Sequence, residues 1–260
     1  MAPQEAGPSQ RSGGSTVGRK RVYEEWKGSE VFFCDGYCMA GPSWKSVIGS
    51  TALIFVPSIV FWALVVPKFL SELWLALLFW AVSVALVTIC LSFLFITACI
   101  DPGVLPRNPE PDEEFLAGRR PRTTEVMVNG YKVVVRYNET CGFYQPPRAH
   151  HCSVNDNCIE RFDHHCPWVG TTVGRRNYRF FLLFVFCTTI LCLFVLGVCL
   201  YQVFFLHSDL SADSENGKVG WGVVIQQSIP ALVILVYCFI LFWFVGGLSG
   251  FHSYLVSTNQ

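Results

Sequence analysis

Nine consecutive residues carry the functional groups of a nucleophilic active site. Segment 161–169 reads Arg-Phe-Asp-His-His-Cys-Pro-Trp-Val, so the Cys166 thiol lies beside two imidazoles and the Asp163 carboxylate. A neighbouring histidine can hold a cysteine as its thiolate at neutral pH, and the thiolate is the nucleophile. The segment therefore predicts covalent catalysis. The alternative is that its histidines and cysteine are only zinc ligands.

The composition favours a membrane protein. About half of the 260 residues are apolar, only 15% are charged, and there are 22 Phe and 8 Trp, a balance that suits a membrane protein better than one soluble domain. The formal net charge is zero, so the total says nothing about nucleic acid, and no nucleic-acid partner is expected. Most of the twelve cysteines lie in or beside apolar runs, where thiols behave as small hydrophobes.

Four apolar runs are long enough to cross a bilayer. They cover 47–66, 73–100, 180–206 and 223–248. The link 68–72 is so short that the first two runs are expected to form a helical hairpin. Buried core helices could imitate one such run, but four of them leave little soluble protein to bury them. The expected fold class is an all-α polytopic membrane protein with four transmembrane helices.

Lys and Arg predict the orientation. Residues 1–45 carry six of them and 101–179 carry eleven, whereas the two short links carry one each. Loops rich in Lys and Arg stay on the cytosolic side. Both termini and the middle segment are therefore expected in the cytosol. Because this compartment is reducing, clustered cysteines there indicate metal binding or catalysis rather than disulfides.

These observations predict five regions. Residues 1–45 form a cytosolic N-terminal segment, disordered over 1–22, and 46–100 hold the first two transmembrane helices. Residues 101–179 form a cytosolic cysteine-rich domain, 180–250 hold the last two transmembrane helices, and 251–260 begin a cytosolic tail. Within the middle segment, alternating β-branched residues from Val126 to Tyr137 surround Asn129-Gly130 and predict a short hairpin.

The middle segment is rich in zinc-ligand residue types. Its Cys and His residues are Cys141, His150, His151, Cys152, Cys158, His164, His165 and Cys166. Cytosolic clusters of this kind generally bind zinc in tetrahedral sites, and the metal would stabilise a segment with few aliphatic residues. The spacing alone does not say which residues would share a zinc.

Four motifs resemble the DHHC protein S-acyltransferases. Segments 144–153 (Tyr-Gln-Pro-Pro-Arg-Ala-His-His-Cys-Ser), 157–170 (Asn-Cys-Ile-Glu-Arg-Phe-Asp-His-His-Cys-Pro-Trp-Val-Gly) and 174–181 (Gly-Arg-Arg-Asn-Tyr-Arg-Phe-Phe) are similar to that family's cysteine-rich domain. Asp101-Pro102-Gly103 is similar to its second motif. The four-span topology also agrees, and the resemblance runs from about Val22 to the C-terminus.

The resemblance implies a two-step acyl transfer. Cys166 would take a long-chain acyl group from palmitoyl-CoA and pass it to a cytosolic cysteine of a substrate protein. His164 would accept the thiol proton, and Asp163 would orient His164. Arg148 would contact the CoA phosphates, or it would pair with a nearby acid. The family also implies an internal membrane (Golgi, ER or plasma membrane) and an accessory subunit in some cases.

The resemblance further implies two structural zincs, each held by three cysteines and one histidine. The first set of matching positions is Asn138, Cys141, His151 and Cys158. The second is Cys152, Asn155, His165 and Thr172. Asn and Thr are poor zinc ligands beside thiolate, so we expect the first site to persist and the second to be much weaker or empty. A water, His150 or Asp156 could complete a site.

The family's Thr-Thr-x-Glu motif after the fourth span is absent, because the chain stops at Ser257-Thr258-Asn259-Gln260. Either the sequence is a truncated fragment, which the abrupt ending favours, or the protein lacks this support for its active-site Asp. The missing motif and the replacement of three expected zinc ligands by Asn or Thr leave a second function possible. The alternative is a membrane scaffold or pseudoenzyme that binds substrates or partner subunits without turnover.

Overall fold

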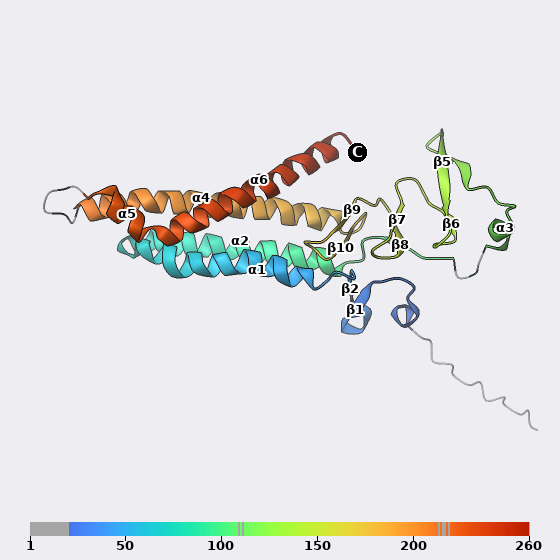
Figure 1. Cartoon of the computed structure of the whole chain (residues 1–260), viewed down its shortest axis with the longest axis horizontal. Coiled ribbons are helices and arrows are strands. Elements are labelled where there is room, and N and C mark those ends of the chain that lie inside the picture. Colours follow the sequence, from blue (N-terminus) through green and yellow to red (C-terminus); the bar gives the residue numbers. More distant parts are fainter. Residues whose placement is uncertain are drawn as a thin grey trace, which may run out of the picture.

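A bundle of long helices carries a strand-rich domain at one end (Figure 1). The computed structural model describes residues 21–108, 110, 112–212, 214, 217 and 219–259. The disorder predicted for 1–22 falls almost entirely on residues outside this set. Three helical runs are long and apolar enough to cross a membrane: Ser46–Cys99, Tyr178–Ala212 and Ile229–Ser257.

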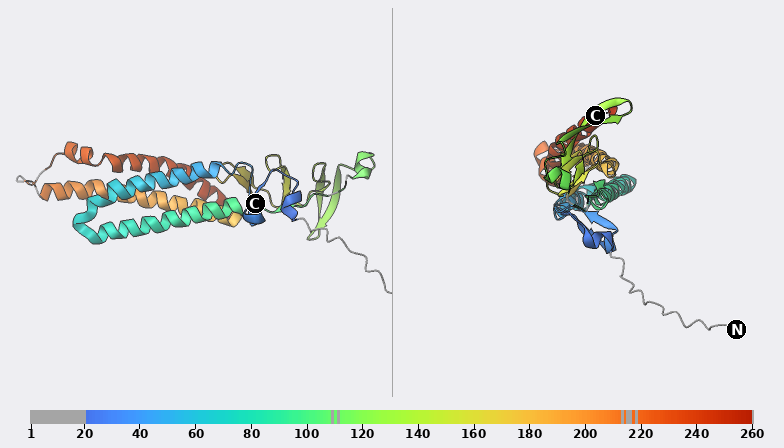
Figure 2. Two further views of the ribbon diagram at one scale, coloured as in Figure 1. Left: turned by 90° about the horizontal axis from the view of Figure 1, so that it is seen from below. Right: turned by 90° about the vertical axis from the view of Figure 1, so that its right-hand side faces the viewer.

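The first of these runs folds back on itself. Helix α1 (Ser46–Val60) continues through a π-helical turn (η3, Phe61–Val65) and a 3-10 segment (η4, Val66–Glu72) into α2 (Leu73–Cys99). Pro57 lacks an amide hydrogen and precedes the π turn, a local widening that commonly relieves a disturbed helical hydrogen-bond ladder. The two limbs lie side by side and antiparallel (Figure 2), as the short link predicts.

The later apolar sequence forms three helices. Helix α4 spans Tyr178–Ala212, α5 spans Trp221–Gln227 and α6 spans Ile229–Ser257. The run expected over 223–248 is thus interrupted at Ser228, where ψ is 7°. Pro230 explains the break, because a proline belongs to the first turn of a helix and cannot extend one already formed. Helix α6 packs against α4 along the bundle.

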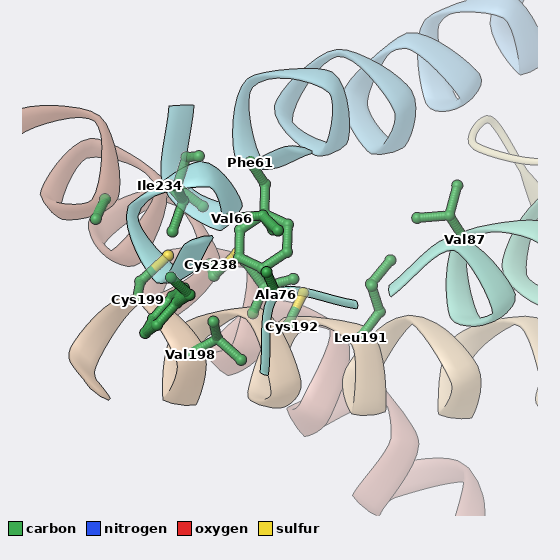
Figure 3. Packing of buried hydrophobic residues seen from close by; sticks show 14 of the residues in the cluster. Phe61, Val66, Ala76, Val87, Leu191, Cys192, Val198, Cys199, Ile234 and Cys238 are labelled. Carbon is green, nitrogen blue, oxygen red and sulfur yellow. The ribbon is translucent and has the colours of Figure 1, made fainter. Parts of the chain in front are cut away.

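The bundle core lies between the hairpin limbs and α4, with α6 covering it (Figure 3). Its fully buried side chains include Phe61, Val65, Phe69, Cys90 and Cys199. Phe69 from η4 stacks on Tyr201 of α4 at a centroid distance of 5.9 Å. Many large apolar side chains on the outside of the helices are exposed, among them Leu73, Trp74, Val233 and Trp243.

The cysteine-rich segment is built from strands, so the expectation of an all-α fold is not confirmed. It contains β3 (Val104–Leu105), α3 (Glu113–Leu116), β4 (Thr123–Val128), β5 (Tyr131–Asn138), β6 (Phe143–Tyr144), β7 (His150–Cys152), β8 (Asn157–Ile159), β9 (His164–Cys166) and β10 (Thr171–Val173). These pair in the orders β3-β8-β7, β4-β5-β6 and β9-β10. Most of these strands have two or three residues, too few for a period-two pattern to be visible in the sequence.

The hairpin predicted around Asn129-Gly130 is present. β4 and β5 pair antiparallel with Val128 opposite Tyr131. Asn129 and Gly130 have φ values of 50° and 84°, the left-handed conformations that a two-residue hairpin turn requires.

The N-terminal segment also forms short elements at the domain end of the bundle (Figure 1). They are η1 (Val22–Glu25), β1 (Val31–Phe33), η2 (Cys34–Gly36) and β2 (Cys38–Ala40). β1 pairs antiparallel with β2. Glu30 directly precedes β1.

Candidate active site and metal positions

Strand β9 separates the adjacent histidines. It pairs with β10 so that Cys166 lies opposite Thr171, His165 opposite Thr172 and His164 opposite Val173. Successive side chains of a strand point to opposite faces. His164 and Cys166 therefore share one face, and His165 points to the other. The alternation assigns the two imidazoles to different surroundings.

Asp163 contacts the ring of His164. Its Oδ2 lies 2.5 Å from Nδ1 of His164. Burial opposes a charge on the imidazole, but hydrogen bonds to Asp163 and Cys166, with the charges of the same groups, raise the pKa of His164 to about 9. A raised pKa makes this imidazole a stronger base. The structure thus brings a carboxylate, an imidazole and a thiol together in one connected set.

Cys166 faces the end of the helical bundle. The thiol residue is 4% exposed. It belongs to an apolar cluster made mostly by the ends of α1, α2 and α4, comprising Val47, Leu94, Ala98, Val169, Val173, Phe181, Phe184 and Val185. The Cys166 thiol therefore lies at the junction between the strand-rich domain and the apolar helices.

Two serines of α1 hold the segment that follows Cys166. The Ser46 hydroxyl donates to the carbonyl of Pro167, and the Ser50 hydroxyl donates to the carbonyl of Trp168 at 2.6 Å. These two hydrogen bonds join the start of α1 to the backbone of residues 167–168. The start of the first limb thus positions the loop next to the thiol.

Asn177 ties β10 to two helices. Its Oδ1 accepts the Gly174 amide at 2.9 Å, and its Nδ2 donates to the carbonyls of Thr172 at 2.9 Å and Thr97 at 3.3 Å. The side chain is completely buried. This amide therefore joins the strand opposite β9 to the end of α2 at the start of α4.

Asp101 fixes the turn by which the chain passes from α2 into the strand-rich domain. Its Oδ1 accepts the amides of Gly103 and Val104, both at 2.8 Å, and its carboxylate also pairs with Arg176. Gly103 has a φ of 110°, which L side chains rarely adopt. The Asp-Pro-Gly motif is thus a turn that joins α2 to the segment preceding α4.

A histidine of helix α6, His252, lies next to the imidazole of His164. The Tyr178 hydroxyl lies 3.0 Å from Nδ1 of His252, which is 3% exposed. The His252 ring packs edge-on against Phe181 at a centroid distance of 5.2 Å and lies 6.3 Å from the ring of His164. His252 therefore forms part of the wall around His164.

Arginines surround the open side of this site. Arg148, Arg161 and Arg175 line one pocket together with Asp163 and Tyr178. Arg175 pairs with Glu160. Arg148 and Arg161 form no ion pair within the part of the chain that the structure describes. Two of the three guanidinium groups are thus available to an anionic ligand.

The first expected metal position holds a compact cluster. Nδ1 of His151 lies 3.6 Å from Sγ of Cys141 and 3.9 Å from Sγ of Cys158. Two ligands of a tetrahedral zinc with bonds of about 2.1 and 2.3 Å are about 3.6 Å apart. Asp156 approaches Nε2 of His151 at 3.5 Å, the support that a carboxylate commonly gives a ligating histidine. The donor set and its spacing fit zinc.

The residues at the second expected metal position are connected by hydrogen bonds. The Oγ1 of Thr172 lies 3.1 Å from Sγ of Cys152, 2.9 Å from Oδ1 of Asn155 and 3.2 Å from Nδ1 of His165. Burial disfavours a thiolate at Cys152, but hydrogen bonds from His165, Thr172 and the backbone lower its pKa to about 7. These are hydrogen-bond distances, shorter than the separations of about 3.4 to 3.6 Å expected around a tetrahedral zinc. Hydrogen bonds thus join these residues, while the buried Nε2 of His165 has no hydrogen-bond partner among the residues that the structure describes.

The sequence is similar to known proteins of one family. The family model for the DHHC palmitoyltransferase matches residues 134–260. Probable protein S-acyltransferase 1 of Arabidopsis thaliana is 37% identical over 265 residues, which cover 93% of this chain and 73% of that protein. The chain belongs to the DHHC palmitoyltransferase family. The DHHC motif of this family is here Asp163-His164-His165-Cys166.

Other family members match nearly the whole chain. Probable protein S-acyltransferase 7 of Arabidopsis thaliana is 41% identical over 97% of this chain, and Protein S-acyltransferase 8 of the same plant is 41% identical over 93%. The chain spans 59% and 62% of the lengths of these two relatives. Its apolar helices and its family make this DHHC chain an integral membrane protein.

Several residues of the site have no individual signal in the sequence. Ser46 and Ser50 are small polar residues in an apolar helix, and His252 is a single histidine near the end of an apolar run. Their partners lie 74 to 121 residues away along the chain. Only the assembled fold identifies them as part of the surroundings of the DHHC motif.

Proposed function

We propose that the protein is a protein S-acyltransferase that uses Cys166 as its acyl carrier. The observation that carries the proposal is the connected Asp163–His164–Cys166 set, with the thiol buried against the apolar ends of the helices. A nucleophile paired with a base that a carboxylate orients is the common arrangement for acyl transfer. The names of the S-acyltransferase relatives support the same assignment.

In the first step the sulfur of Cys166 attacks the thioester carbonyl of a long-chain acyl-CoA. His164 takes the thiol proton on Nε2, because Nδ1 faces Asp163. The carbon–sulfur bond to CoA breaks, and the leaving thiolate receives the proton from His164. The products are acyl-Cys166 and free CoA thiol.

In the second step a cysteine of a substrate protein attacks acyl-Cys166. His164 takes the proton of the incoming thiol, a new thioester forms on the substrate, and Cys166 leaves and recovers the proton. The imidazole thus serves as base and then as acid in both halves. Acyl-CoA and a protein thiol are consumed, and CoA thiol and an S-acylated protein are released.

The acyl chain would extend into the bundle. A narrow apolar cavity lies among the helices, lined among others by Ile54, Phe61, Leu191 and Tyr237. Ile54 also packs against the cluster that contains Cys166. A continuous apolar path from the thiol into the bundle would remove the hydrocarbon chain from water. Palmitoyl is the chain length that the family name suggests.

The topology we propose has four spans. The limbs α1 and α2 would each cross the membrane, as would α4 and α6. η4 and α5 are both at the end of the bundle far from the strands (Figure 1). This agrees with a topology in which both termini and the DHHC domain are on the cytosolic side, where Lys and Arg are concentrated. An internal membrane of the Golgi or ER, or the plasma membrane, would be the compartment.

Cys141, His151 and Cys158 would hold one structural zinc. The metal would stabilise the cysteine-rich domain, which has little apolar core of its own. Arg148 and Arg161 would contact the phosphates of CoA on the open side of the active site, since arginine suits the bidentate binding of phosphate. Cytosolic cysteines of substrate proteins would be the acceptors, and an accessory subunit could join the complex.

A membrane scaffold without turnover is the second candidate. The observation that favours it is the replacement of zinc ligands by Asn138, Asn155 and Thr172, because a loose frame would aim His164 poorly at Cys166. In that case acyl-Cys166 would not form, or would form without transfer.

A single-turnover transfer assay separates the two candidates. The purified chain would be labelled with radioactive palmitoyl-CoA, freed of donor and mixed with a peptide containing one cysteine. For an acyltransferase, label leaves the protein as it appears on the peptide, and a serine-for-cysteine peptide receives none. Label that stays on the protein, or never reaches it, would favour the scaffold.

A further inference from the structure

The second metal position lies next to the N-terminal segment. Nδ2 of Asn155 donates to Oε1 of Glu30 at 3.2 Å, across 125 residues of chain. The Ser29 amide donates to the carbonyl of Asn155 at 2.9 Å. Asn155 is completely buried and Glu30 is 8% exposed. The residue that replaces a family zinc ligand is therefore the residue that holds the segment before β1.

Glu30 is satisfied as a buried carboxylate. Its Oε2 accepts hydrogen bonds from Nδ2 of Asn157 and from Nε1 of Trp26, both at 2.8 Å. Arg107 donates to Oδ1 of Asn157 at 3.0 Å and orients that amide. A buried charge is tolerated when enough donors surround it. Three neutral donors here replace the solvent that Glu30 has lost.

Gly28 allows this close approach. Its φ is 148°, and a Cβ on it would lie 2.0 Å from Nδ2 of Asn157 and 2.4 Å from Oε2 of Glu30. Any larger side chain would overlap the atoms that form the hydrogen bonds. The absence of a side chain at residue 28 thus lets the backbone before β1 lie directly against Asn157 and Glu30.

Asn155 links this cluster to the Thr172 cluster. Its Oδ1 accepts from the Thr172 hydroxyl, while its Nδ2 donates to Glu30. A cysteine at this position has one sulfur atom and could not make both bonds. Thr172 in turn contacts His165 on β9. One hydrogen-bonded path therefore runs from β9 through the former metal position to the N-terminal segment.

We propose that the second zinc of the family is replaced here by a metal-free polar latch. The latch consists of Cys152, Asn155, His165, Thr172 and Glu30. It holds β9 and β10 against the domain, the task that a metal would otherwise perform, and it fastens residues 26–30 to the same surface. The proposal concerns structure and metal content, and it stands or falls independently of acyl transfer.

Metal analysis of the purified wild-type protein tests the absence of the second zinc. We expect about one zinc per chain, bound by the first cluster. Cys158→Ala should lose it, whereas Cys152→Ala should retain it. Two zincs per wild-type chain, or loss of zinc in Cys152→Ala with Cys158→Ala still loaded, would overturn the proposal.

The double variant Asn155→Cys/Thr172→Cys provides the complementary test. It restores three cysteines and His165 at the second position, so the metal content should rise from about one to about two per chain. The gain would show that the wild-type side chains exclude the metal. If the wild-type chain already binds two zinc ions, the substitutions will add no further zinc, and the latch is refuted.

Hydrogen exchange tests the latch itself. Glu30→Ala should accelerate exchange of the Ser29 amide at least about tenfold, since it leaves buried donors unpaired and loosens the segment. The exposed Glu139→Ala is the matched control. Zinc content should stay the same in both. Unchanged exchange at Ser29 in both Glu30→Ala and Asn155→Ala would contradict the latch.

Discussion

His164 and His165 are adjacent in the chain but lie on opposite faces of β9. His164 faces Asp163 and Cys166, whereas His165 faces Thr172 and Cys152. One short strand therefore joins the Asp163–His164–Cys166 set on one face to the cluster around Thr172 on the other. We expect a change in that cluster to alter the position of His164 without removing any of the three groups.

The Asp163–His164 pair should control the rate of acyl-enzyme formation. We expect His164→Ala to slow formation of acyl-Cys166 by about 10² to 10⁴, because the thiol loses its base. Asp163→Asn should also slow it, since the imidazole loses the carboxylate that raises its pKa. Rapid-quench labelling with palmitoyl-CoA measures both. The exposed His150→Ala should react at the wild-type rate, and an equally slow His150→Ala would point to a general defect.

The first Cys/His cluster should account for most of the metal-dependent stability. Cys158→Ala removes one of three clustered ligands, so the protein should lose zinc and melt at a lower temperature. Differential scanning fluorimetry with and without a chelator measures the effect. The chelator should destabilise the wild type and the exposed Cys34→Ala variant equally, and should have little further effect on Cys158→Ala. A chelator-insensitive wild type would be incompatible with a structural zinc here.

Asn177 should be critical for stability. Asn177→Ala removes three buried hydrogen bonds and should cost on the order of 2 to 4 kcal/mol, because the partners remain buried and unpaired. Thermal unfolding in detergent would show the loss. Thr140→Ala, at an exposed position, serves as the control. Equal melting temperatures for the two variants would contradict this role.

His252 should affect the reaction without contacting the acyl group. We expect His252→Ala to slow acylation of Cys166 about tenfold, or about 1.4 kcal/mol in the barrier, since the wall behind His164 is lost. Tyr178→Phe removes only the hydrogen bond to His252 and should have a smaller effect. His207→Ala, near the far end of α4, should leave the rate unchanged. A wild-type rate for His252→Ala would exclude this contribution.

Local chemistry made parts of the structure predictable from the sequence. The Asn129-Gly130 hairpin follows from the backbone conformations that those residues accept. The hairpin of α1 and α2 follows from two apolar runs joined by a short link. The contacts among Asp163, His164 and Cys166 could be expected because the residues are contiguous. In each case the cause lies within a few residues of the feature.

The remaining features depend on contacts between distant segments. Nothing near Glu30 in the chain indicates that it reaches Asn155. The replacement of zinc ligands by Asn155 and Thr172 appears as erosion in the sequence, yet the folded chain makes these residues hydrogen-bond partners of each other. Apart from the predicted β4–β5 hairpin, the strands of the domain have only two or three residues, too few to show a period-two pattern against the all-α expectation.

Mapping of the acylated residue shows whether Cys166 is the acyl carrier. The protein would be incubated with palmitoyl-CoA, digested and analysed by mass spectrometry before and after hydroxylamine, which cleaves thioesters. We expect a hydroxylamine-labile palmitoyl group on the peptide that contains Cys166, and its loss in Cys166→Ala. Equal labelling of Cys166→Ala, with the acyl group on other cysteines, would contradict it.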